Sequence, residues 1–186
     1  ASVVMLDPDG TPVGRPPCWG SGYFPPVFQG TLFRPGETPI IDLYPADGRS
    51  RSRQRQSLDL LKSLNEIQRR PDDAQLLSRL ATYELAFRMQ SAAAEAFDVS
   101  GEPQHVLDAY GPGNQARQML IARRLVERGV RIVQVYHGNT QPWDSHDLIE
   151  ENHGKLAGEC DQGIAALLTD LKQLGLLDET LVICGG

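Results

Sequence analysis

The alternation of hydrophobic and polar positions divides the chain into three segments. Residues 1–50 hold short apolar pieces separated by turns rich in proline and glycine, so this segment is expected to be loop-rich. In residues 51–114 the apolar positions recur at helical spacing, which predicts two amphipathic helices folded as a helical hairpin. Residues 115–186 alternate helical spacing with runs of β-branched side chains and therefore predict an α/β segment. It begins with a helix expected from Gln115 to Arg128, and Gly129 follows where a left-handed C-cap belongs.

Two apolar runs in the third segment predict buried parallel strands. Residues 130–136 follow Gly129 and are almost continuously apolar, as in a strand covered on both faces, and residues 180–184 have the same character. Two helical segments are expected between these runs, residues 148–158 and 160–174. Together with the runs they predict a right-handed βαβ unit, in which both strands end at the same edge of the sheet. Ligands bind at that edge in open α/β sheets.

Side chains that can bind a metal follow the first of these two strands. His137, Asp144 and His146 lie in a short loop that also contains glycine, asparagine and proline. Because Asp144 and His146 are two residues apart, an extended loop points both side chains the same way, as oxygen and nitrogen ligands for one divalent ion. His137, at the end of the strand, is a third candidate ligand. The alternative is a loop that is held by hydrogen bonds and by the ring of Trp143.

The composition limits the classes of function. A chain of 186 residues with 40% hydrophobic content is expected to form a single domain around one core. Its net charge of −6 argues against a general nucleic-acid partner. No apolar run approaches the roughly 20 residues of a membrane span. The three cysteines form neither a CxxC pair nor the dense framework of a disulfide-stabilised domain.

Five stretches together resemble a known bacterial family. They occupy residues 22–31, 83–90, 122–131, 141–146 and 170–183, and one of them reads Gln-Pro-Trp-Asp-Ser-His. In these stretches the chain resembles the domain-of-unknown-function family 1501, which is similar to sulfatases and to the alkaline phosphatase superfamily. The resemblance implies an α/β/α sandwich that hydrolyses a small-molecule or polymeric sulfate or phosphate ester at a divalent metal, without distinguishing zinc, manganese and calcium. It also implies that the parent protein is exported.

The resemblance gives individual residues roles and also has gaps. Asp144 and His146 match the family's Trp-Asp-x-His motif, whereas His137 is a candidate from its strand-end position alone. The family's Glu-Phe-Gly-Arg segment, its later Asp-His pair and its early Asp-containing strand have no counterpart, and no Cys-x-Pro-x-Arg or Ser-x-Pro-x-Arg motif occurs. We therefore expect an internal fragment: an incomplete sandwich with a mainly parallel sheet that is inactive by itself.

Two alternatives to a metal-dependent hydrolase stay open at this point. The first is a non-catalytic binding or scaffold domain with the same fold, which would use the loop without a metal. The second is a hydrolase with a cysteine nucleophile, whose candidates would be Cys18, Cys160 and Cys184. No base has a recognisable spacing to any of the three, and buried thiols are usually unreactive.

Overall fold

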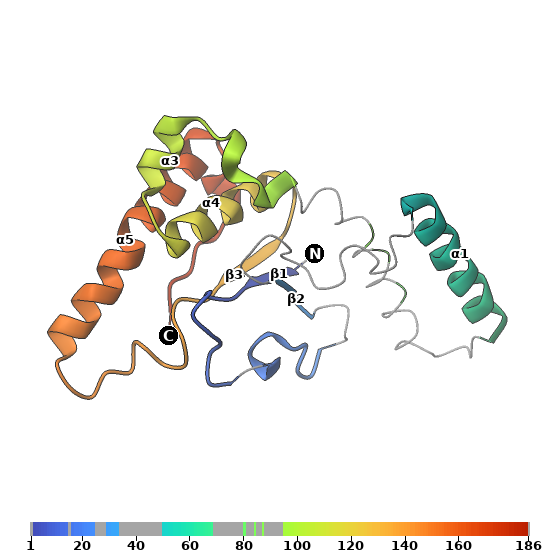
Figure 1. Cartoon of the computed structure of the whole chain (residues 1–186), viewed down its shortest axis with the longest axis horizontal. Helices are drawn as coiled ribbons and strands as arrows, with labels where there is room; N and C mark the ends of the chain where they lie inside the picture. Colours follow the sequence, from blue (N-terminus) through green and yellow to red (C-terminus); the bar gives the residue numbers. More distant parts are fainter. Residues whose placement is uncertain are drawn as a thin grey trace.

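A small parallel sheet forms the centre of the fold. The computed structural model describes residues 2–14, 16–24, 29–33, 50–68, 80, 84, 87 and 95–185. Strand β1 (Ser2–Met5) lies between β2 (Thr31–Phe33) and β3 (Ile132–Val135), and both neighbours are parallel to it (Figure 1). The expected mixed α/β class with a parallel sheet is confirmed.

In the described part of the chain, three helices pack together beside this sheet, and a fourth lies earlier in the chain, in residues 51–68. Figure 1 shows α3 (Gln104–Tyr110), α4 (Asn114–Glu127) and α5 (Ile149–Gln173) packed together, and α1 (Arg51–Gln68) is the first helix of the predicted hairpin. Its predicted partner, residues 72–97, falls mostly outside the described residues. The described residues also contain three short 3₁₀ helices: η1 (Pro16–Trp19), η3 (Val99–Gly101) and η4 (Leu177–Glu179).

Helix α4 joins the sheet to α5 because it has apolar side chains on two faces. One face contributes Ile121 and Leu125 to a buried cluster with Val3 and Met5 of β1. The other face contributes Leu120 to a second cluster, which includes Tyr110, Leu167 and Leu171 from α3 and α5. The two clusters together form the core that supports the sheet.

The sequence predicted a strand from Val130, and β3 begins two residues later at Ile132, whereas the expected cap at Gly129 is confirmed. Gly129 follows α4 with a φ of 79°, a left-handed conformation that glycine adopts without steric cost. The N–H of Val130 then donates to the carbonyl of Leu125 at 3.0 Å, which closes the helix end as the sequence predicted. Val130 and Arg131 link this cap to the first residue of the strand, Ile132.

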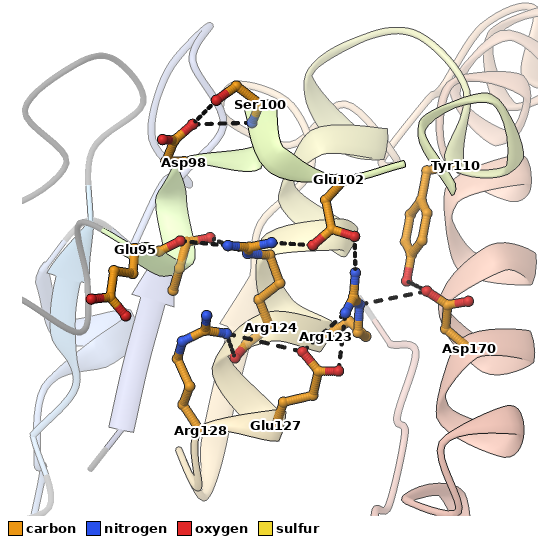
Figure 2. Close-up of polar contacts among 11 residues, drawn as sticks. Glu95, Asp98, Ser100, Glu102, Tyr110, Arg123, Arg124, Glu127, Arg128 and Asp170 are labelled. Carbon is orange, nitrogen blue, oxygen red and sulfur yellow. Dashed lines mark hydrogen bonds and ion pairs between the residues drawn. The ribbon is translucent and has the colours of Figure 1, made fainter. Parts of the chain in front are cut away.

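An ion-pair network holds the segment that precedes α3 against helix α4. Figure 2 shows Arg123 and Arg124 pointing to different oxygens of Glu102, and the Arg123 contact is 2.7 Å long. Arg123 also lies 2.9 Å from Glu127 and 3.5 Å from Asp170 of α5. Buried charges are tolerated only when they are paired and hydrogen-bonded, and this network meets that condition for Glu102.

The pKa values of this network follow from burial and pairing. Burial pushes the pKa of Glu102 upward, but hydrogen bonds from Arg123 and Arg124 outweigh it and hold the pKa below its usual value. Burial and the neighbouring Asp170 raise the pKa of Tyr110, whose hydroxyl donates to Asp170 at 3.1 Å. Glu102 therefore stays ionised and Tyr110 stays protonated at neutral pH.

Two predictions about the strands are wrong. Strand β3 is not buried: none of its residues is buried and Ile132 is 59% exposed, and the strand pairs with β1 alone among the described strands. Residues 180–184 form no strand: Leu181 is 84% exposed and Ile183 is 79% exposed. A strand needs a hydrogen-bonded neighbour, and the structure pairs this segment with none of the described strands, so only the first strand and the helix of the predicted βαβ unit are present.

The helical part of that unit also differs from the prediction. The sequence predicted one helical segment up to Gly158 and a second from Cys160, but α5 continues through Gly158 as a single helix. A Cβ added at Gly158 would meet no atom within 4 Å, so this glycine is neither a turn nor a close contact. Gly163 on the same helix is different, since an added Cβ would lie 3.2 Å from the Cα of Ala116 in α4.

Candidate metal-binding site

Two loops meet at the carboxyl edge of the sheet, because β1 and β3 are parallel and end there together. The loop after β1 and the loop after β3 contact each other through a parallel bridge between Pro12 and Thr140. The N–H of Thr140 also donates to the carbonyl of Thr11 at 3.0 Å. The predicted metal-binding loop is therefore attached to the end of the central strand.

Asp7 is the buried centre of this attachment. Its side chain is only 6% exposed, and one carboxylate oxygen accepts from the N–H of Gly138 at 2.8 Å and from the amide of Gln115 at 2.9 Å. The same amide lies 3.1 Å from the carbonyl of Tyr136. Because Tyr136 and Gly138 flank His137, the backbone on both sides of this histidine is fixed by Asp7 and by α4.

The His137 ring is held by an acidic and an aromatic side chain. Its Nε2 lies 3.2 Å from a carboxylate oxygen of Glu159 on α5. Its ring also meets the ring of Trp143 edge-on, with 5.6 Å between centroids. Trp143 in turn lies beside His153, whose Nε2 is 2.8 Å from the Trp143 carbonyl. His153 is therefore bonded locally.

Asp144 and His146 are adjacent and open to solvent. The Oδ1 of Asp144 lies 3.2 Å from the Nε2 of His146, and these side chains are 62% and 83% exposed. Two ligand atoms that bind one ion at about 2.1 Å lie about 3.0 Å apart in octahedral geometry and about 3.4 Å apart in tetrahedral geometry. The observed separation falls between these values, and an oxygen–nitrogen donor set suits zinc or manganese. The pair fits two positions around such an ion.

The backbone of this loop is strained at its two ends. Thr140 and Leu148, the only non-glycine residues with positive φ in the described ranges, have φ values of 59° and 48°. Side chains with a Cβ are disfavoured in this left-handed region, and a cost of roughly 1–3 kcal/mol per residue is typical of binding and catalytic loops. The strain therefore falls on the two sides of Trp143, Asp144 and His146.

The three predicted ligands do not form one cluster. Asp144 and His146 lie together, whereas His137 pairs with Glu159. Within the residues that the structure describes, no group of three or more His, Cys, Asp or Glu side chains is arranged to hold an ion. Metal binding by His137, Asp144 and His146 remains a prediction.

Sequence reasoning missed two residues of this site. Asp7 begins Asp-Pro-Asp-Gly, one of the proline- and glycine-rich turns of the first segment, although its place directly after an apolar piece was a usable indication. Glu159 had no local indication, because it approaches His137 only through the packing of α5. Both carboxylates act on the loop from other elements of the fold.

The cysteines give little support to a thiol nucleophile. Cys18, Cys160 and Cys184 are free. Burial raises the pKa of Cys160, and Cys184 and acidic neighbours raise it further. A raised pKa lowers the fraction of reactive thiolate at neutral pH.

Among the described residues, no helix is both long enough and apolar enough to cross a membrane.

Comparison with known proteins identifies a family. The family model described as "Protein of unknown function (DUF1501)" matches residues 1–186. No curated protein and no solved structure matches the chain. The resemblance found in the five sequence stretches is thus confirmed at the level of the family. The chain belongs to the DUF1501 family.

Proposed function

We propose that the chain is the metal-binding part of a metal-dependent hydrolase of sulfate or phosphate esters. The observation that carries this proposal is the 3.2 Å separation of the Asp144 Oδ1 and His146 Nε2 atoms in an exposed loop. The loop lies at the carboxyl edge of a parallel sheet, where ligands bind in α/β proteins. The family's resemblance to sulfatases, and the α/β/α sandwich that it implies, favour ester hydrolysis over other metal chemistry.

In this proposal each side chain has a definite task. Asp144 and His146 would hold the divalent ion, and their exposure leaves room for a small or polymeric ester to approach. A bound ion would supply Lewis-acid chemistry by polarising an ester oxygen and offsetting developing charge. Asp7 and Gln115 fix the start of the loop through the backbone at Tyr136 and Gly138. The nucleophile is not assigned.

Anion binding that depends on the metal tests this proposal. Inorganic phosphate and sulfate would be titrated calorimetrically into the metal-free chain and into the zinc-loaded chain. The proposal predicts binding only to the zinc-loaded form, and loss of that binding in an Asp144→Ala/His146→Ala variant. Anions that bind neither form, or both forms equally, would contradict it.

A second candidate function, a non-catalytic binding or scaffold domain, has one specific observation in its favour. The same 3.2 Å is an ion-pair distance between a protonated His146 and Asp144, and such a pair would close the loop without a metal. An exposed pair of this kind contributes only about 0–1 kcal/mol to stability. If the Asp144→Ala/His146→Ala variant lost clearly more than this in the absence of metal, the loop would be structural and the scaffold function favoured.

A further inference from the structure

The two ring nitrogens of His137 have different surroundings. Nε2 lies 3.2 Å from the Glu159 carboxylate, which can only accept a hydrogen bond when it is ionised. In a neutral ring the proton must therefore lie on Nε2, and Nδ1 must carry the lone pair. The contact with Glu159 thus selects one of the two tautomers.

Nδ1 is buried and has no hydrogen-bond partner among the residues that the structure describes. Buried polar atoms are nearly always satisfied, so an orphaned lone pair calls for an explanation. The residue itself is not loose: Asp7 binds the backbone next to it, and the Trp143 ring packs against its edge. Nδ1 is therefore held in a fixed position, and its lone pair is free to bind a metal ion.

We propose that Glu159 is a positioning residue that presents His137 Nδ1 as a metal ligand. This inference rests on the proposed function and deepens it, because it names the ligating nitrogen and the residue that orients it. Metal-binding histidines usually donate their second ring N–H to a carboxylate, which fixes the tautomer and the ring orientation. His137 and Glu159 have this arrangement, and Trp143 connects His137 to the neighbouring Asp144.

Nitrogen-15 NMR of the histidine side chains, recorded at mildly alkaline pH, tests this assignment without any activity assay. Spectra of the whole chain would be recorded before and after zinc is added, for the unmodified protein and for Glu159→Ala. Asp161→Asn is the matched control, because it removes a negative charge from the same helix. Within the described part of the chain, Asp161 accepts a hydrogen bond only from the adjacent backbone N–H of Gln162. Zinc affinities of the same proteins would be measured by calorimetry.

The expected result is an Nε2–H tautomer in the metal-free protein and a shift of the His137 Nδ1 resonance when zinc binds. Glu159→Ala should lose the slowly exchanging Nε2–H proton and weaken zinc binding about tenfold, the lower end of the range for such carboxylates, since Glu159 is half exposed. Asp161→Asn should change neither property.

Three results would overturn the assignment: a proton on Nδ1, zinc bound through Nε2, or equal zinc affinity in Glu159→Ala. The spectra also separate this inference from the proposed function. If zinc shifts His146 and leaves His137 unchanged, the inference fails while the Asp144–His146 pair stands. If zinc shifts neither histidine, the proposed metal function fails as well.

Discussion

Replacement of Glu102 by glutamine should destabilise the fold by about 3 kcal/mol at neutral pH. The carboxylate accepts charged hydrogen bonds from Arg123 and Arg124, and each such bond contributes roughly 1.5–3 kcal/mol. Breaking a buried pair costs about 3–5 kcal/mol when the partner charge is left unpaired. Here Arg123 keeps Glu127, and Arg124 keeps the backbone carbonyl of Ala96, so the lower end applies.

The pH dependence of this effect has a definite sign. The pKa of Glu102 is lowered in the folded protein, so its contribution is complete above the unfolded-state pKa of about 4.3. The contribution disappears as the pH falls through the folded-state pKa. The stability difference between the unmodified protein and Glu102→Gln should therefore be largest at neutral pH and shrink below about pH 4.

Urea unfolding at a series of pH values measures both quantities. Glu179→Gln is the matched control, because Glu179 is exposed and its replacement removes the same charge. The control should change stability by less than about 0.5 kcal/mol. A difference for Glu102→Gln below about 1 kcal/mol, or one that persists unchanged in acid, would refute the assignment of this network as the anchor of the chain before α3.

The remaining predictions concern packing, the loop and the exposed end of the described chain. Gly163→Ala should destabilise the fold by about 1–3 kcal/mol in thermal unfolding, because the added Cβ would meet the α4 backbone at 3.2 Å. Gly158→Ala, where the added Cβ meets no atom, should stabilise the fold by about 0.5–1 kcal/mol. Equal effects of the two substitutions would contradict the packing of α5 against α4. Asp7→Ala should lower the free energy of unfolding by about 2–3 kcal/mol, since it leaves the buried donors of Gly138 and Gln115 unpaired. It should also speed amide hydrogen exchange in the loop after β3. Unchanged exchange would show that Asp7 does not hold this loop. Leu181→Lys/Ile183→Lys should reduce self-association in light scattering, and a monomeric unmodified chain at high concentration would contradict this.

The sequence predicted those elements whose hydrophobic period and end signals agree. The helix expected from Gln115 to Arg128 is α4 (Asn114–Glu127), and Gly129 ends it as expected. The central strand was only a possible short strand in the prediction, because four apolar residues between turns show no period. For residues 180–184 the sequence predicted a strand that the structure does not have. Their β-branched composition favours a strand, but strand pairing is decided by distant parts of the chain.

The same limit applies to the candidate site. The two-residue spacing of Asp144 and His146 predicted that they would lie together, and their atoms are 3.2 Å apart. Asp7 lies 131 positions from Gly138, and Glu159 lies 22 positions from His137. Contacts over such separations depend on how strands and helices pack, so periodicity and local motifs could not predict them.

The central claim is that Asp144 and His146 bind a divalent metal. Calorimetric titration of zinc and of manganese into the unmodified chain and the Asp144→Ala/His146→Ala variant tests it most directly. A His105→Ala/Asp108→Ala variant is the matched control, because it removes the same two residue types from an exposed face of α3. The account predicts saturable binding of a single ion that is lost in the first variant and kept in the control. Binding that survives in the Asp144→Ala/His146→Ala variant, or no binding to the unmodified chain, would contradict it.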